Sequence, residues 1–254
     1  MAIYHPDGEL SLGQPRGARF YSDVASFNPA AWLAANTVAY WRMAGASGAG
    51  ETDRTLRGND LVAAGSVGSA AGKLTTARSF ASASDQYLRR DDTTDLQPGS
   101  GDFIIAAWVK PSANASVLPV VAANGSGIGL TTYSLTLSDN GDGTFLVGWI
   151  VTSAEQDSAA AASFGSWHLV IGRANLANGD LRLSIDNVTE AASGDVPSTP
   201  NAAHFYVGAN NDAGGYDGLI DDVLIARANT PMNDAAFDAL CAYLWNGGNG
   251  RQVF

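Results

Sequence analysis

Paired carboxyl groups are the first residues of this sequence to consider for chemistry. Hydrolysis of a glycosidic bond with retention needs two carboxyl groups about 5 Å apart, a spacing that alternate positions of one strand can supply. The four glutamates are each more than thirty residues from the next: Glu9, Glu51, Glu155 and Glu190. Asp221 and Asp222 are adjacent, and on a regular strand they would point to opposite faces. We therefore expect the protein not to be an enzyme.

Nucleophilic catalysis has equally little support. The chain has three histidines, His5, His168 and His204, and one cysteine, Cys241. His168 lies inside a predicted strand, and Cys241 falls on the apolar face of a predicted helix, where it would have to turn outward to meet a base. No G-x-S-x-G motif, phosphate-binding loop or His/Cys zinc spacing occurs. A single cysteine also cannot form an internal disulfide.

The charge of the chain excludes two classes of partner. Its 254 residues include 25 acidic and 14 basic side chains, which gives a formal net charge of −11. Nucleic acid and anionic membranes both bind clustered Lys and Arg, so we expect no nucleic acid and no membrane as partner. No window holds 18 consecutive apolar residues, and the N-terminus lacks the basic and apolar regions of a signal peptide. The acidity is typical of a soluble surface.

The N-terminal region differs from the rest of the chain. Residues 1–36 carry no alternating apolar pattern, and we interpret them as an N-terminal arm. Asn28 can cap a helix and Pro29 suits its first position, so a short helix is predicted at 29–35. Residues 37–254 then form one domain with no internal repeat or linker.

Short strands dominate residues 37–254. A first strand begins at Thr37, and residues 51–72 are small and polar and are expected to be irregular. Further strands are predicted at 76–81, 86–90, 102–110, 116–123, 131–138, 144–151, 166–174, 180–186, 203–208 and 218–227. The glycine-rich stretch 139–143 predicts a hairpin connection. Asn233 is expected to cap one C-terminal helix, whose apolar residues recur at i, i+3, i+4, i+7 and i+8.

Four segments in order carry a resemblance to a known family. They are 39–43 (AYWRM), 77–88 with 102–111 (DFIIAAWVKP), 166–170 (SWHLV) with 181–187 (LRLSIDN), and 205–208 (FYVG) with 218–223 (GLIDDV). Together they resemble the laminin-G-like family of the concanavalin A-like lectin/glucanase fold, from about residue 37 to 250. The resemblance implies an all-β fold: a two-sheet antiparallel β-sandwich (a jelly roll) with one C-terminal α-helix and the N-terminal arm.

The resemblance also implies two kinds of site. Relatives often carry a structural Ca²⁺, and the acidic positions that match the family are Asp85, Asp221 and Asp222. Sugar binding is the usual role of the fold and would need an exposed aromatic ring flanked by polar groups. The candidate residues are Tyr216 with its polar loop residues Asn210, Asn211 and Asp212, and, on strands, Trp149 and Tyr133. Each of the three aromatic residues could instead belong to the core.

These features predict a structural protein or a ligand-binding protein. Laminin-G-like domains usually occur in secreted proteins, whereas this chain begins with Met and has no signal peptide, a combination typical of proteins released in virus particles. We therefore expect a non-enzymatic bacteriophage virion protein, a capsid decoration or tail/fibre component located in the virion. The alternative is a carbohydrate-binding lectin module of an extracellular multidomain protein, and a glycan-active enzyme is third.

The arm is the expected partner contact. Its aromatic residues could anchor it in other virion proteins or in a second copy of the chain, and surface glycans are a further expected partner. These residues are Tyr4, Phe20, Tyr21, Phe27 and Trp32. The alternative is that they fold back over the edge of the sandwich.

Overall fold

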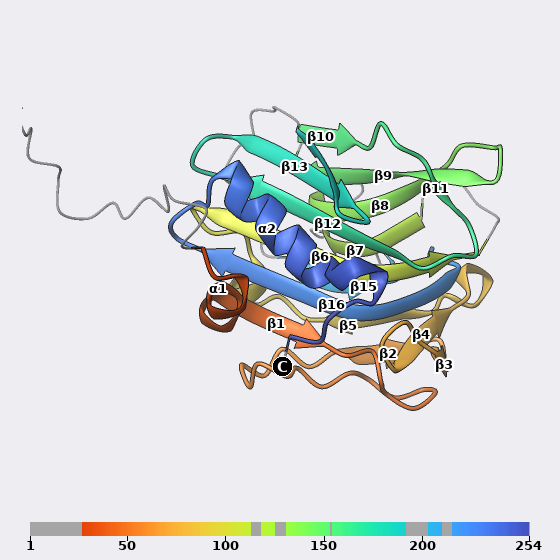
Figure 1. Cartoon of the computed structure of the whole chain (residues 1–254). Coiled ribbons are helices and arrows are strands. Elements are labelled where there is room, and N and C mark those ends of the chain that lie inside the picture. The colour runs from red at the N-terminus through yellow and green to blue at the C-terminus, as the bar shows by residue number, and fades with distance from the viewer. Residues whose placement is uncertain are drawn as a thin grey trace, which may run out of the picture.

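The computed structural model describes residues 27–112, 118–124, 131–152, 154–191, 203–209 and 215–253. Within them, two antiparallel sheets lie face to face (Figure 1), as the sequence predicts. Sheet I has the order β14 (Val188–Ala191), β13 (Asp180–Ile185), β12 (His168–Asn175), β6 (Asp102–Pro111), β16 (Gly218–Ala228), β4 (Thr76–Phe80) and β3 (Gly68–Ala71), and β1 (Thr37–Trp41) also pairs with β16.

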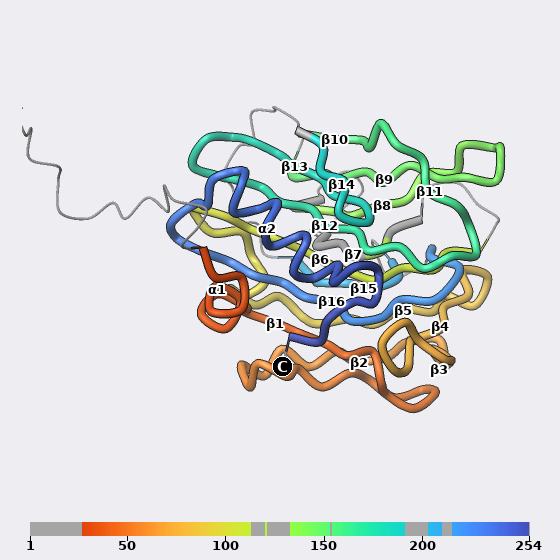
Figure 2. Tube along the Cα trace, in the orientation of Figure 1, coloured from red at the N-terminus to blue at the C-terminus, as the bar shows by residue number. Residues whose placement is uncertain are grey.

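Sheet II forms the other layer of the sandwich. Its order is β10 (Ala154–Asp157), β9 (Thr144–Val151), β8 (Thr131–Asp139), β7 (Leu118–Asn124), β15 (His204–Val207), β5 (Tyr87–Arg90) and β2 (Val62–Ala64), and β11 (Ala162–Ser163) also pairs with β9. Short 3₁₀ turns occur at η2 (Ser82–Ser84), η3 (Thr94–Leu96) and η4 (Asn246–Gly248). Figure 2 shows how β1, from the start of the described chain, runs beside β16 near its end.

The pattern of β6 explains why this strand is apolar on both faces. Phe103 and Ile105 point between the two sheets, into the main core. Ile104 and Trp108 point to the other face of sheet I, into a second core under the helices. Buried on both sides, β6 is the central strand that its sequence predicts.

Two helices cover the outer face of sheet I. The helix α1 (Pro29–Asn36) is capped by Asn28, whose side chain accepts from the N–H of Ala31. In Figure 1, α2 (Asp234–Trp245) crosses the sheet over β12, β6 and β16, and the Asn233 side chain caps its first turn. Both helices begin at the capping residues that the sequence predicts. No helix in the described part of the chain is long and apolar enough to span a membrane.

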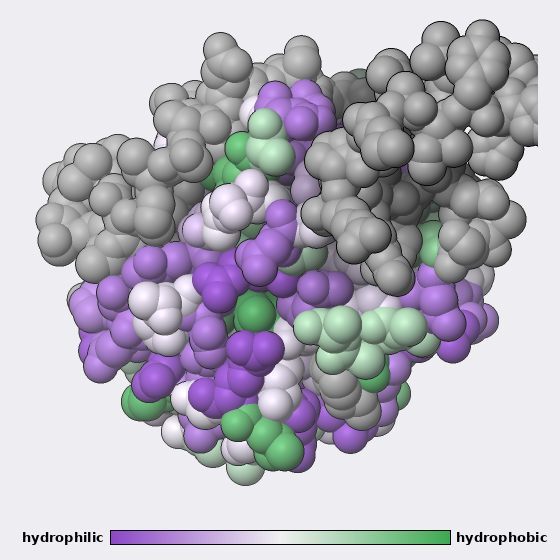
Figure 3. Space-filling model, turned by 90° about the vertical axis from the view of Figure 1, so that its left-hand side faces the viewer, coloured by the Kyte–Doolittle hydropathy of each residue, from purple (hydrophilic) through white to green (hydrophobic). Residues whose placement is uncertain are grey.

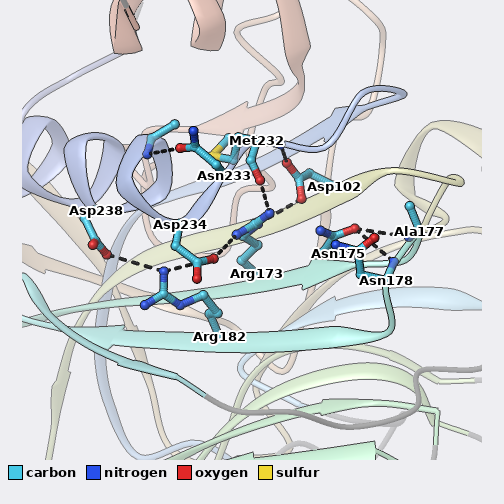
Figure 4. A network of polar contacts seen from close by, with 11 residues as sticks. Asp102, Arg173, Asn175, Ala177, Asn178, Arg182, Met232, Asn233, Asp234 and Asp238 are labelled. Atoms are coloured by element: carbon cyan, nitrogen blue, oxygen red, sulfur yellow. Dashed lines mark hydrogen bonds and ion pairs between the residues drawn. The ribbon is translucent and has the colours of Figure 1, made fainter. Parts of the chain in front are cut away.

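A buried polar network fixes α2 to the sheet (Figure 4). Arg173 of β12, 2% exposed, donates from Nε to Asp102 at 2.8 Å and from Nη1 to Asp234 at 3.2 Å. Its Nη2 donates to the carbonyl of Met232, and the N–H of Met232 donates to Asp102. Arg182 reaches Asp234 from β13 at 3.2 Å. The buried carboxylate and guanidinium therefore satisfy each other and hold the start of α2.

The C-terminal part of the arm belongs to the sandwich. Phe27 and Trp32 are 9% and 5% exposed and pack in the second core with residues of α2 and sheet I. The expectation that these two residues bind a partner is therefore wrong, because their apolar surface is already covered within the chain. Tyr4, Phe20 and Tyr21 lie outside the described residues, and for them the expectation stays a prediction.

The predicted irregular segment contains two strands. β2 and β3 lie within residues 51–72, where small and polar residues give no clear alternation. The strands β10, β11 and β14 are likewise short and were not predicted. At one end of the sandwich, the described residues present a mainly hydrophilic surface on which apolar residues form small separate patches (Figure 3).

Candidate functional site

A pocket of about 200 Å³ opens where β2 and β5 form the edge of sheet II. We call it the edge pocket. It is lined by Asp60, Val62, Ala63, Ala64, Tyr87, Arg89, Arg90 and Asp91. The lining combines an aromatic ring, short apolar side chains and four charged groups, which is the mixture that small polar ligands use for orientation.

Strand pairing decides which side chains face the pocket. In the antiparallel pair, Val62 lies opposite Arg89 and Ala64 lies opposite Tyr87. These positions alternate with Leu88, which is buried in the main core, so Tyr87 and Arg89 lie on the outer face of the sheet. Arg90 is the last residue of β5 and also lines the pocket. By the same alternation Arg90 lies on the side of Leu88, opposite Phe205 of β15, so the pocket is lined from both faces of β5 at the end of the strand.

Aromatic rings continue this outer face onto the neighbouring strand. Tyr87 meets Tyr206 of β15 edge to face, with ring centroids 5.7 Å apart. His204 meets the other side of Tyr206 at 6.4 Å. Such edge-to-face contacts hold the rings in fixed orientations. The half-buried Tyr87 ring is thus a firm wall on which the apolar face of a ligand can pack.

Among the described residues, some charged groups around the pocket have ionic partners and others do not. Asp91 lies 3.5 Å from Arg89 and 3.4 Å from His204, so two cationic or polar groups share it. Asp60 accepts one hydrogen bond, from the N–H of Asp53 at 2.8 Å. Arg90 forms no ion pair within the described residues, and its buried Nε has no hydrogen-bond partner there. The pocket therefore offers both a donor and acceptors to a polar ligand.

The aromatic residues proposed as sugar platforms are in the core. Tyr216, Trp149 and Tyr133 are each 0% exposed. The Tyr133 hydroxyl donates to the carbonyl of Leu96 at 2.7 Å, and that of Tyr216 donates to Leu219 at 3.1 Å. The expectation that these three rings bind sugar at the surface is wrong, because each ring packs in the core between the sheets.

The prediction for Tyr216 relied on the polar residues next to it in the sequence, but the Tyr216 ring itself is buried. Asn210, Asn211 and Asp212 lie outside the described residues, and for them a role in sugar binding stays a prediction. The residues of the edge pocket were not predicted as a site. The alternation in 86–90 places Tyr87 and Arg89 on one face, but nothing in the sequence indicates that β2 would border them.

The residues proposed for Ca²⁺ do not fit that ion. Asp85 is exposed and ends η2 with a left-handed backbone, φ 45°. Asp221 and Asp222 are buried at 0% and 6% exposed, and no three His, Cys, Asp or Glu side chains of the described residues gather into a metal site. Ca²⁺ takes about six to eight oxygen ligands, whereas the carboxyl groups of this pair already accept hydrogen bonds from the N–H of Leu74 and the Tyr40 hydroxyl. A Ca²⁺ ion is therefore not supported here.

The Asp221–Asp222 pair also corrects the expected strand geometry. The pairing of β16 with β6 shifts after Asp221, and Asp222 has a left-handed backbone with φ 44°. This β-bulge brings the two carboxyl groups within hydrogen-bond reach of each other, so they do not point to opposite faces. Asp221 accepts from the N–H of Leu74 at 2.9 Å, and Asp222 accepts from the Tyr40 hydroxyl.

Burial and mutual repulsion make this pair hold a proton. Burial, together with the negative charge of Asp221, raises the pKa of Asp222 to about 8. Burial also raises the pKa of Asp221. Asp222 borders a cavity of only about 10 Å³, together with Tyr40, Trp108 and Arg251. Such a space holds about one water molecule, so the pair has no access to a sugar and is structural.

A Ser–His–Asp arrangement spans the two sheets, with Ser163 on β11 of sheet II and His168 at the start of β12 of sheet I. His168 Nδ1 lies 2.6 Å from the Asp186 carboxylate, and Nε2 lies 3.0 Å from the carbonyl oxygen of Ser163 and 3.5 Å from its hydroxyl. A carbonyl oxygen can only accept, so Nε2 carries a proton and donates it there. Nε2 is then unable to take the serine proton, which is the step that a catalytic base performs.

The fold and this surface define a lectin-type β-sandwich. The model of the "Concanavalin A-like lectin/glucanases superfamily" (Laminin_G_3) matches residues 81–232, more than half of the chain. The chain belongs to this family. No curated protein sequence matches it.

Solved structures with the same fold differ widely in sequence. Domain 4 of AbnA, an extracellular GH43 arabinanase from Geobacillus stearothermophilus crystallised with arabinotriose, is 17% identical with a TM-score of 0.61, over 81% of this chain and 98% of that domain. The binding domain of Paraclostridial Mosquitocidal Protein 1 is 15% identical with a TM-score of 0.60, over 84% of this chain and 53% of that one.

A third similar structure is the binding domain of botulinum neurotoxin DC, solved with rat synaptotagmin II. It is 11% identical with a TM-score of 0.59, over 83% of this chain and 52% of that one. The chain thus spans about half the length of the two toxin binding domains. At these identities the likeness establishes the fold alone.

Proposed function

We propose that this protein is a non-catalytic glycan-binding module whose edge pocket holds a sugar. The observation that carries the proposal is the edge pocket itself, which Tyr87 lines together with the charged residues Arg89, Arg90, Asp60 and Asp91. An aromatic ring can cover the apolar face of a sugar, while guanidinium and carboxylate groups bond its hydroxyls. The complex of the arabinanase domain with arabinotriose supports a sugar as ligand.

The absence of hydrolysis is part of this proposal. Within the described residues, the Asp221–Asp222 pair borders a one-water cavity, and His168 donates from the atom that would have to act as base. These features support the proposal that the protein does not cleave its ligand. Incubating the protein with any saccharide that it binds is expected to yield no cleavage product, and turnover that Asp221→Asn abolishes would contradict this.

The more specific role, a virion component such as a capsid decoration or tail/fibre protein, remains a second proposal. An outward-facing glycan-binding sandwich suits a particle that attaches to a cell surface. The support is the acidic sequence and the N-terminal residues 1–26, which carry no alternating apolar pattern and could attach the protein to a particle or to a second copy. Electron microscopy of particles from the producing cells, labelled with an antibody against the protein, tests it: label confined to soluble material would contradict a virion role.

A glycan array tests the binding proposal directly. The full chain should bind a defined subset of saccharides, and Tyr87→Ala should lose that binding, whereas Tyr87→Phe should retain most of it because the ring remains. Tyr243→Ala is the matched control, since Tyr243 is also half-buried but lies on α2, on the outer face of sheet I. Equal binding by Tyr87→Ala and wild type would contradict the proposed site.

A further inference from the structure

We infer that the edge pocket selects an acidic sugar, one whose carboxylate is bound by Arg90; this inference rests on the proposed glycan-binding function. Arg90 is a charged side chain that lines the pocket without a partner. Within the described residues it makes no ion pair, and its buried Nε donates no hydrogen bond. An uncompensated guanidinium that lines a pocket favours a bound anion, because a charge-assisted hydrogen bond to it is stronger than one to a neutral group.

The neighbouring acidic residues do not remove this need. Asp91 is already engaged at 3.5 Å by Arg89 and at 3.4 Å by His204. Other arginines at buried positions of this acidic chain do have carboxylate partners: Arg78 lies 3.4 Å from Glu51, and Arg173 lies 2.8 Å from Asp102. Arg42, like Arg90, has a buried Nε without a hydrogen-bond partner in the described residues, but of the two only Arg90 lines the edge pocket.

The planar fork of a guanidinium matches a carboxylate. Two parallel N–H groups can donate to its two oxygens, which makes this pairing stronger and more specific than a bond to a neutral hydroxyl. A sugar carboxylate would supply both oxygens, whereas a neutral sugar would leave part of the guanidinium unpaired.

The other lining residues fit the rest of such a ligand. Asp60 is exposed and, among the described residues, accepts one hydrogen bond, from the N–H of Asp53, so it can accept from sugar hydroxyls. Tyr87 and the 71%-exposed Val62 offer apolar surface to the carbon face of the ring. At about 200 Å³ the pocket is smaller than those of drug-sized ligands, which are about 300–1,000 Å³. It therefore suits one terminal acidic sugar unit.

Matched acidic and neutral ligands test the inference. The probes are trigalacturonate and sialyllactose, each compared with its carboxyl methyl ester by isothermal titration calorimetry on the full chain. At least one acid should bind about ten- to a hundredfold more tightly than its ester, because hydrogen bonds to charged groups contribute that much. Arg90→Gln should remove this preference, so that each acid and its ester bind with similar affinity. Arg54→Gln, an exposed arginine outside the pocket, is the control and should behave as wild type.

The outcomes distinguish a failure of this inference from a failure of the proposed glycan-binding function. If other saccharides bind in a Tyr87-dependent way but neither acid exceeds its ester, the glycan-binding function stands and the inference is wrong. An acid preference that survives Arg90→Gln also overturns it. If no saccharide binds at all, both the proposed function and the inference fail. A melting temperature for each variant shows that any loss of binding occurs in folded protein.

Discussion

Replacing Asp222 by Asn should change how the stability of the protein depends on pH. In the folded protein burial raises the pKa of Asp222 from 3.8 to about 8. Between about pH 4 and pH 8 the folded state therefore holds a proton that the unfolded state has lost. Stability that is fully present below pH 4 is thus lost as the pH rises towards 8, and the curve levels off above that.

The size of the effect follows from the same pKa values. A rise from 3.8 to about 8 corresponds to on the order of 5 kcal/mol, at about 1.4 kcal/mol for each tenfold change in proton affinity. An asparagine at this position keeps an oxygen for the Tyr40 hydroxyl and supplies an N–H to Asp221 without titrating. Between about pH 4 and pH 8 the free energy of unfolding of Asp222→Asn should therefore fall by several kcal/mol less than that of wild type. Above pH 8 the variant should be more stable than wild type.

Urea unfolding between pH 4.5 and 9, followed by tryptophan fluorescence, measures this effect. Asp139→Asn is the control, because Asp139 is exposed in the hairpin and Asn can also accept from the N–H of Gly141. Groups such as Asp102, whose pKa is also raised by burial, contribute equally to all three proteins. If the free energy of unfolding of Asp222→Asn falls with pH as steeply as that of wild type, the shared proton does not exist.

Three further predictions concern stability. Trp108→Ala should cost about 3–5 kcal/mol, because Trp108 is 2% exposed and stacks on Trp245 at 5.4 Å; thermal unfolding close to wild type would contradict the second core. Arg173→Met should cost about 3–5 kcal/mol by leaving Asp102 buried and unpaired, and the double variant with Asp102→Leu should recover much of it; a double variant no more stable than the single one would argue against the ion pair. Adding Ca²⁺ or EDTA should leave the melting temperature unchanged, and a Ca²⁺-dependent rise that Asp221→Asn abolishes would restore the metal site.

The sequence predicts most of the sandwich because its strong signals are local. In β6 the residues of both faces are apolar, and this identifies the central strand that the structure shows. Asn28 and Asn233 carry the capping oxygens at the starts of both helices. Asn187 has a left-handed backbone with φ 67°, a conformation that Asn tolerates and that suits the hairpin there. Each of these features depends on a few neighbouring residues.

The site is less predictable because it depends on distant pairing and irregular backbone. The edge pocket exists because β2 pairs with β5, and the Val62–Ala64 segment is too short to show a period of its own. The meeting of Asp221 with Asp222 depends on one bulge, which strand alternation does not indicate. Tyr216 lies beside a polar loop, yet its ring meets Phe80 in the core at 6.0 Å. Tertiary packing decides all three.

The measurement that tests the central claim most directly is a map of ligand-induced amide shifts. The full chain, labelled with ¹⁵N, would be titrated with the saccharide that binds best on the array. The account predicts that the largest shifts fall at Asp60–Ala64 and Tyr87–Asp91, the two segments that line the edge pocket. Shifts confined to α2 or to other strands, or no shifts at saturating saccharide, would contradict it.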